Sequence, residues 1–261
     1  MRRCRSVGAL RVSGIFSSNF VENGPSFLTF ALAAGHNLRM NLFICSNRCS
    51  GERTYGEDAD RSGFVRIGRG HWQRHWLIDQ PGATLVEQGD WNRPALAAWR
   101  SALETEIDRH PSVDIVAHSL GCLLVAALAG RPIVERIRSA LLVGPCDLEE
   151  TERLHPGAIA FGGMPRQRLS FPSLVVGSLN DPYMRFDRLR ILCEEWGGRL
   201  VDLGHAGHIN IASGFGRWPA GYDLLQVLNG MAKDDRSITA PTMLVRQLAR
   251  SAPASRQRSF S

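Results

Sequence analysis

The sequence lacks any long apolar segment. None of its hydrophobic runs approaches the roughly 18–20 residues that a helix needs to cross a bilayer. The basic start at Met1 is not followed by an apolar region of the signal-peptide kind, and the apolar stretch from Phe27 to Ala34 comes late, after Glu22. We therefore expect a cytoplasmic protein without a membrane partner.

Cysteine is scarce, and its six copies are scattered along the chain. This number and spacing do not predict a disulfide framework, so reduced thiols are expected. Cys45 and Cys49 are four residues apart, but no matching cysteine or histidine pair lies nearby, which makes a zinc site a weak interpretation. Cys122 is expected to be a small buried packing residue.

Lysine is almost absent, since only Lys233 among the 31 basic residues is a lysine. The formal net charge of +6 is concentrated in two flanks. Residues 1–66 hold nine arginines against five acidic residues, and residues 232–261 hold six basic against two acidic residues. Residues 67–231 hold sixteen arginines against eighteen acidic residues. The middle is therefore slightly acidic, and we expect no nucleic-acid partner.

The same three regions differ in pattern. Residues 1–66 form an atypical N-terminal segment, rich in serine, glycine and arginine, without sustained periodicity. Residues 67–231 alternate short apolar runs with amphipathic stretches, which predicts an α/β sandwich with a mostly parallel central sheet and helices on both faces. Residues 232–261 are polar and basic and are predicted to be a disordered tail.

Strands and helices are expected to alternate within the middle region. Leu96, Trp99, Leu103 and Ile107 form one apolar stripe of a predicted helix over residues 94–108. The other predicted elements are strand 113–117, helix 122–129, strands 140–143 and 174–176, helix 186–196 and strand 200–203. In such folds functional groups gather at the carboxyl ends of the strands.

The junction Ala117-His118-Ser119-Leu120-Gly121 is a variant of the Gly-x-Ser-x-Gly nucleophile elbow. The chain must turn sharply from strand to helix, so the residues two before and two after the serine must be small. Gly121 meets this requirement, and Ala117 adds only one methyl group. A serine that merely caps the helix is the alternative. The strand before and the apolar helix after favour Ser119 as a nucleophile, with the Leu120 N–H as an oxyanion donor.

A serine nucleophile needs a base that is itself oriented by a carboxylate. In folds with this nucleophile elbow, the acid follows the serine in sequence and precedes the histidine. Asp181 follows strand 174–176 and is the candidate acid, whereas Asp202 is interpreted as a surface charge at a strand end and Asp187 as a residue of a helix's first turn. His205 and His208 both follow the last strand, and spacing alone does not separate them.

Several segments between residues 69 and 228, taken together and in order, are specific to a family. They are Gly70-His-Trp-Gln73, Val86-Glu-Gln-Gly-Asp-Trp91 with Pro94, Val116-Ala-His-Ser-Leu-Gly-Cys122, Ser178-Leu-Asn-Asp-Pro-Tyr183, and Gly207-His-Ile-Asn210 followed by Ser213-Gly-Phe-Gly216 and Trp218-Pro219. The sequence resembles the small α/β-hydrolases related to the retinoblastoma-binding serine hydrolase and its bacterial YdeN-like relatives.

This resemblance implies roles for individual residues. Ser119 would be the nucleophile, Asp181 the orienting acid and His208 the base, because the family's histidine lies inside Gly-His-Ile-Asn. His205 then has no assigned role. The resemblance also implies a hydrolase without metal or other cofactor, whose partner is a small-molecule ester or amide substrate.

The sequence before Phe64 departs from the family. Members begin with a buried strand and a glycine-rich loop just before His-Trp-Gln, and that loop supplies the second oxyanion donor. Here Phe64-Val-Arg-Ile-Gly-Arg-Gly70 stands in its place. One hypothesis is a mis-chosen start or a frameshift in the gene model, which reading the upstream DNA in its other frames would test. If the segment is genuine, the first strand is expected in Leu10 to Phe16 or Leu42 to Cys45.

The sequence thus predicts a serine hydrolase that cleaves a small ester through Ser119, His208 and Asp181 and an acyl-enzyme intermediate. An aminopeptidase-like amidase is one alternative. A catalytically impaired binding protein with the same fold is another, because the family includes a member named for protein binding and the oxyanion loop is not recognisable. Apart from that name, nothing in the sequence indicates a protein partner.

Overall fold

The computed structural model of the chain describes residues 10–11, 41–46, 70–80 and 82–234. The strands are β1 (Leu10–Arg11), β2 (Asn41–Ser46), β3 (Ala83–Leu85), β4 (Val113–His118), β5 (Ile137–Val143), β6 (Ser173–Gly177) and β7 (Arg199–Asp202). The helices are α1 (Trp72–Asp79), α2 (Leu96–Asp108), α3 (Leu120–Ala126), α4 (Leu148–Leu154), α5 (Phe186–Trp196) and α6 (Ala220–Asp234), with short 3-10 helices at Pro132–Arg136 and Ile211–Ser213. No helix within these ranges has the length and apolar character to cross a bilayer.

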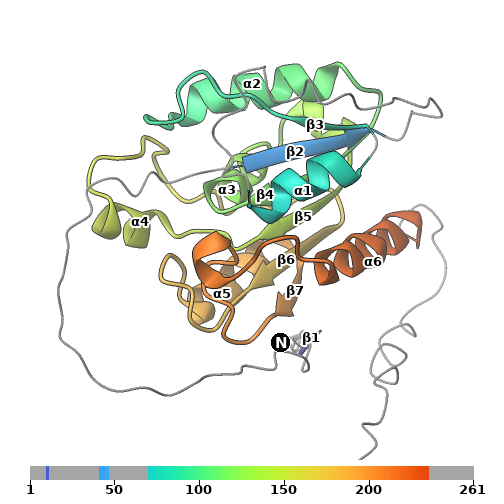
Figure 1. The fold of residues 1–261 in the computed structure, drawn as a ribbon. Coiled ribbons are helices and arrows are strands. Elements are labelled where there is room, and N and C mark those ends of the chain that lie inside the picture. Colours follow the sequence, from blue (N-terminus) through green and yellow to red (C-terminus); the bar gives the residue numbers. More distant parts are fainter. Residues whose placement is uncertain (1–9, 12–40, 47–69, 81, 235–261) are drawn as a thin grey trace, which may run out of the picture.

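The seven strands form one sheet in the order β1-β7-β6-β5-β4-β2-β3 (Figure 1). From β1 to β4 all neighbours are parallel, and only β2 runs against its two neighbours. Strands covered on both faces are apolar on both sides of the pleat, which explains the uninterrupted apolar residues 115–117 of β4, 140–143 of β5 and 174–176 of β6. The carboxyl ends of β4, β6 and β7 share one edge of the sheet, and that edge gathers the loops that follow them.

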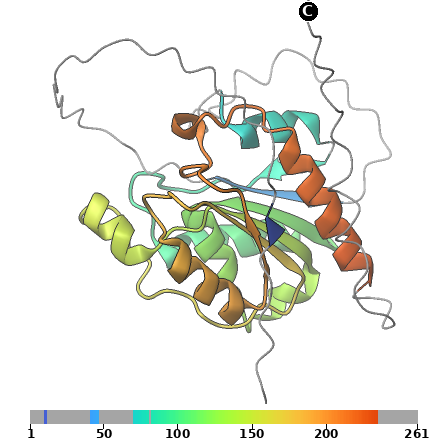
Figure 2. The ribbon, with the colours of Figure 1, turned by 90° about the horizontal axis from the view of Figure 1, so that it is seen from below.

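Two hydrophobic clusters cover the two faces of the sheet. Along β4, Ile115 and Ala117 point into a cluster with α2, α3 and α5, whereas Val116 points into a cluster with α1 and α6. In Figure 2, α5 and α6 accordingly lie on opposite sides of the sheet. The predicted sandwich, with its mostly parallel sheet and helices on both faces, is confirmed.

Some of the predicted helices have the expected bounds, and others differ by a few residues. The predicted helix over residues 186–196 is α5 with the same bounds, and the stripe expected over residues 94–108 buries Trp99, Leu103 and Ile107 in α2. The apolar helix expected at residues 122–129 instead begins at Leu120, because the turn out of β4 consumes only Ser119, and it ends at Ala126. The disordered tail was predicted to begin at residue 232, but residues 232–234 belong to α6, and from residue 235 onward the tail lies outside the described residues.

Strand β2 contains the expected Leu42 to Cys45 segment, but it is antiparallel to β4. Its first residue, Asn41, pairs with His118, and its last residue, Ser46, pairs with Val113 at the opposite edge. Strand β2 therefore ends, at Ser46, on the edge of the sheet away from Ser119. This differs from the arrangement that the family resemblance implies, in which the first strand leads into the oxyanion loop.

Gly177, the last residue of β6, is a point of close approach between the sheet and α5. A Cβ atom at this position would overlap the Leu189 side chain, which is only 1% exposed in the core. Because a buried leucine has little room to move, we expect Gly177→Ala to lower the free energy of unfolding by about 1–3 kcal/mol. Urea unfolding measures the change.

The matched control is Gly163→Ala, since a Cβ at Gly163 would meet nothing within 4 Å. This substitution should leave the free energy of unfolding within about 0.5 kcal/mol of the wild-type value. Equal unfolding midpoints for the two variants would contradict the close packing of Gly177 against Leu189.

Candidate active site

Ser119 occupies a strained turn between β4 and α3. Its backbone angles are φ 58° and ψ −128°, an unfavourable conformation for a residue with a side chain. The Ser119 N–H donates to the Val143 carbonyl at 3.0 Å, which ties the turn to β5. Leu120 is the first residue of α3, so its N–H belongs to the group that helix geometry leaves without an intrahelical acceptor. The turn therefore presents both a hydroxyl and a backbone donor.

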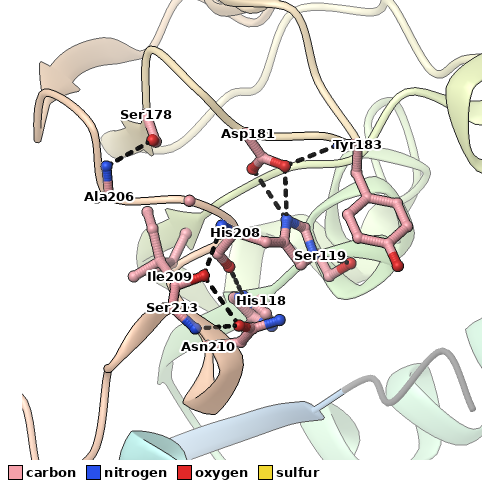
Figure 3. A network of polar contacts seen from close by, with 12 residues as sticks. His118, Ser119, Ser178, Asp181, Tyr183, Ala206, His208, Ile209, Asn210 and Ser213 are labelled. Atoms are coloured by element: carbon pink, nitrogen blue, oxygen red, sulfur yellow. Dashed lines mark hydrogen bonds and ion pairs between the residues drawn. The ribbon is translucent and has the colours of Figure 1, made fainter. Parts of the chain in front are cut away.

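The structure brings Ser119, Asp181 and His208 together in one chain of hydrogen bonds (Figure 3). His208 Nε2 lies 2.9 Å from Ser119 Oγ, and His208 Nδ1 lies 3.0 and 2.9 Å from the two Asp181 oxygens. A carboxylate only accepts hydrogen bonds, so Nδ1 carries the proton and Nε2 is left to accept the Ser119 O–H. The serine and histidine are 2% and 6% exposed.

Two loops at the carboxyl edge carry the acid and the imidazole, and they are bonded to each other. Ser178 Oγ accepts the Ala206 N–H at 2.9 Å, and Asn180 Oδ1 accepts the Gly207 N–H at 2.8 Å. The Ser178 hydroxyl also donates to Asn180 Oδ1 at 2.8 Å. Asp181 in turn accepts the N–H of the residue two further on, at 2.9 Å. These bonds position Asp181 relative to His208 before any substrate arrives.

The other ionisable candidates lie outside this arrangement. His205 is exposed on the same loop as His208. Asp187 lies in the first turn of α5, as expected, where it pairs with Arg185. The interpretation of Asp202 as a surface charge is wrong: the residue is only 7% exposed, and its carboxylate accepts the Gly204 N–H at 2.7 Å.

Sequence reasoning missed Tyr183, which lies beside the imidazole, and His155, which contacts Tyr183. The Tyr183 ring packs against His208 with 4.4 Å between centroids, and its hydroxyl lies 2.9 Å from His155 Nε2. Burial and the nearby Asp181 carboxylate raise the pKa of Tyr183, so its hydroxyl is neutral. Tyr183 could have been suspected from its place in the Ser178 to Tyr183 segment. His155 follows α4 and carries no sequence signal.

The buried thiols near the site are not suited to act as nucleophiles. Cys122 is buried, and burial raises its thiol pKa well above the ordinary value, which confirms the expectation of a packing residue. Burial likewise raises the pKa of Cys146 to about 12. The described residues contain no group of three histidine, cysteine or acidic side chains that could hold a metal ion. Of the Phe64 to Gly70 segment, only Gly70 lies within the described residues.

The chain is similar to known proteins both in sequence and in structure. A family model described as serine hydrolase matches residues 62–227. A solved YdeN-like hydrolase from Pectobacterium atrosepticum is 30% identical, with a TM-score of 0.54 over 64% of this chain and 87% of that chain. The ydeN gene product of B. subtilis is 21% identical, with a TM-score of 0.43 over 55% of this chain and 80% of that chain. No curated protein matches the chain.

Proposed function

Because the chain belongs to the serine hydrolase family, we propose that it cleaves a small-molecule ester through a Ser119–His208–Asp181 triad and an acyl-enzyme intermediate. The observation that supports this most strongly is the unbroken path from Ser119 Oγ through both ring nitrogens of His208 to the Asp181 carboxylate. The slightly acidic middle of the chain favours a small substrate over a nucleic acid.

The proposed reaction uses each of these groups in turn. Ser119 Oγ attacks the ester carbonyl carbon while its proton passes to His208 Nε2, and the Leu120 N–H donates to the resulting oxyanion. The imidazolium then protonates the departing alcohol, which leaves an acyl group on Ser119. His208 next takes a proton from water, whose oxygen attacks the acyl carbon. The imidazolium then returns this proton to Ser119 Oγ as the bond from Oγ to the acyl carbon breaks, which releases the carboxylic acid and restores the serine. Asp181 keeps Nδ1 protonated and stabilises the imidazolium throughout without accepting its proton.

An ester ranks ahead of an amide for a physical reason. An alcohol is a better leaving group than an amine, and an ester carbonyl lacks amide resonance, so less stabilisation of the oxyanion is needed. Leu120 is the oxyanion donor that we assign to this chain. The aminopeptidase-like amidase is therefore the second candidate. The third candidate is a catalytically impaired binding protein with the same fold.

We expect the protein to release p-nitrophenol from p-nitrophenyl acetate and butyrate with an initial burst of about one equivalent per protein molecule. The burst arises because an activated ester acylates a serine faster than water removes the acyl group. Stopped-flow absorbance measures its amplitude, and p-nitroanilides with the same acyl groups should react far more slowly.

Other results would point elsewhere. Faster turnover of the anilides would favour the amidase. Release no faster than in buffer, together with no labelling by a fluorophosphonate probe in folded protein, would contradict catalysis and favour the binding protein. The specific relation to the retinoblastoma-binding serine hydrolase, and with it any protein partner, stays a prediction.

A further inference from the structure

His118, the residue immediately before Ser119, is bonded to the backbone of His208. Its Nε2 atom lies 2.8 Å from the His208 carbonyl oxygen, although 90 positions separate the two residues in the sequence. A carbonyl only accepts hydrogen bonds, so the His118 Nε2 atom carries a proton and donates it. The side chain is 1% exposed and lies at the end of β4. Figure 3 shows His118 below the imidazole of His208, on the side away from Tyr183.

The backbone that His118 contacts is itself strained. Ile209 has a φ of +51° and is fully buried, and a β-branched residue is strongly disfavoured in this region. Its carbonyl accepts the Trp72 Nε1–H at 2.9 Å, and the His208 N–H donates to Ser213 Oγ at 3.0 Å. Side chains from three different elements therefore hold this turn. Of the three, only His118 comes from the strand that carries the nucleophile.

The strand β4 thus determines the positions of both reacting groups. It places Ser119 directly, through the turn at its end, and it places His208 through the side chain of His118. Two hydrogen bonds of ordinary length link β4 to His208. His118 Nε2 lies 2.8 Å from the His208 carbonyl oxygen, and His208 Nε2 lies 2.9 Å from Ser119 Oγ. A shift of the His208 backbone away from β4 would lengthen the distance between His208 Nε2 and Ser119 Oγ.

We infer that His118 is a positioning residue for hydrolysis, whose Nε2–H bond to the His208 carbonyl sets the distance between the base and the Ser119 hydroxyl. This role rests on the proposed function of Ser119 and deepens it. His118 touches no reacting atom and transfers no proton. It acts entirely through the backbone of His208.

The state of the His118 ring agrees with this role. Burial, together with the His208 and His71 imidazoles nearby, lowers the pKa of His118 well below its ordinary value. Its Nδ1 atom is buried without a hydrogen-bond partner among the described residues, so a second proton there would find no acceptor. The ring is therefore neutral and does not compete with His208 as a base. His71 and His208 are the ionisable side chains whose rings face it, at 5.2 and 4.9 Å.

Three substitutions separate positioning from mere packing. His118→Phe keeps a buried ring but removes the donor, and we expect kcat for p-nitrophenyl acetate to fall by about tenfold to a hundredfold. Substrate binding is not altered, so KM should stay within about twofold of wild type. His118→Gln carries an amide N–H that reaches the position of Nε2 and should restore kcat to within about threefold of wild type. In His118→Asn the amide is too short to reach, so kcat should fall as in His118→Phe.

The control is Ser139→Ala, in β5, where Ser139 pairs with Asp114 near the amino end of β4. Ser139 Oγ donates to Asp114 at 2.6 Å, so this variant also loses one buried hydrogen bond of the strand, and its melting temperature should fall with kcat unchanged. If the wild type neither hydrolyses the ester nor labels with a fluorophosphonate, the proposed function itself fails. If the wild type is active and folded His118→Phe keeps its kcat, the positioning role is overturned. Should His118→Phe not fold, equal kcat values for His118→Gln and His118→Asn would overturn it.

Discussion

Substitution of Ser119 by alanine should abolish covalent labelling by a fluorophosphonate and lower kcat for ester hydrolysis by roughly ten-thousandfold to a millionfold. The side chain supplies the only oxygen that lies within 2.9 Å of His208 Nε2 in the described residues, so its loss removes the nucleophile and leaves the imidazole without a proton to accept. In-gel fluorescence measures the labelling, and p-nitrophenol release measures kcat. Addition of His208→Ala to the same chain should cause little further loss, because the two residues act as one unit.

A second buried serine provides the matched control. Ser173 begins β6, is 2% exposed, and its hydroxyl has no partner among the described residues. Ser173→Ala should keep full labelling and full hydrolysis, because it removes a buried hydroxyl far along the sheet from the carboxyl edge. Persistent labelling of folded Ser119→Ala would mean that another residue is the nucleophile.

Asp181→Asn should lower kcat by about ten-thousandfold while the protein stays folded. Both oxygens of the carboxylate lie within hydrogen-bonding distance of His208 Nδ1 and hold its proton there. An amide offers a donor as well as an acceptor. When the donor faces Nδ1, the ring proton moves to Nε2, and His208 can no longer accept the proton of Ser119. Steady-state hydrolysis of p-nitrophenyl acetate measures the loss.

Asp202 supplies the control for this substitution, because it also stands at the carboxyl end of a strand and is also buried. Its carboxylate accepts the Gly204 N–H, a role that the amide oxygen of asparagine can fill. Asp202→Asn should therefore retain kcat within about twofold. Comparable losses in the two variants would mean that Asp181 has no special relation to the imidazole, and the proposed triad would lose its acid.

The parts of the site that could be predicted from the sequence are those with local signatures. A strand, a serine flanked by small residues and an apolar helix suffice to predict the strained turn at Ser119, since its geometry is set within a few residues. Asp181 follows from chain order and from its place after a strand. The choice between His205 and His208 needed the family resemblance, because both follow β7 within a few residues and only the folded loop exposes His205 and buries His208.

Long-range features were not predictable in the same way. A short apolar run has the same pattern in both directions, so the segment Leu42 to Cys45 gave no sign that β2 runs against β4. The burial of Asp202 depends on a turn closed by Gly204, which the pattern of a four-residue strand does not contain. His155 meets Tyr183 across 28 positions of sequence, and no periodicity connects the two.

The bonds between the loops that carry Asp181 and His208 give the site a particular mechanical character. Because Ser178 and Asn180 join one loop to Ala206 and Gly207 of the other, the acid and the base share one set of supports. A substitution that displaces either loop is therefore expected to displace Asp181 and His208 together. Its effect would then fall on the distance from His208 Nε2 to Ser119 Oγ, the same distance that the His118 bond to the His208 carbonyl holds from the side of β4.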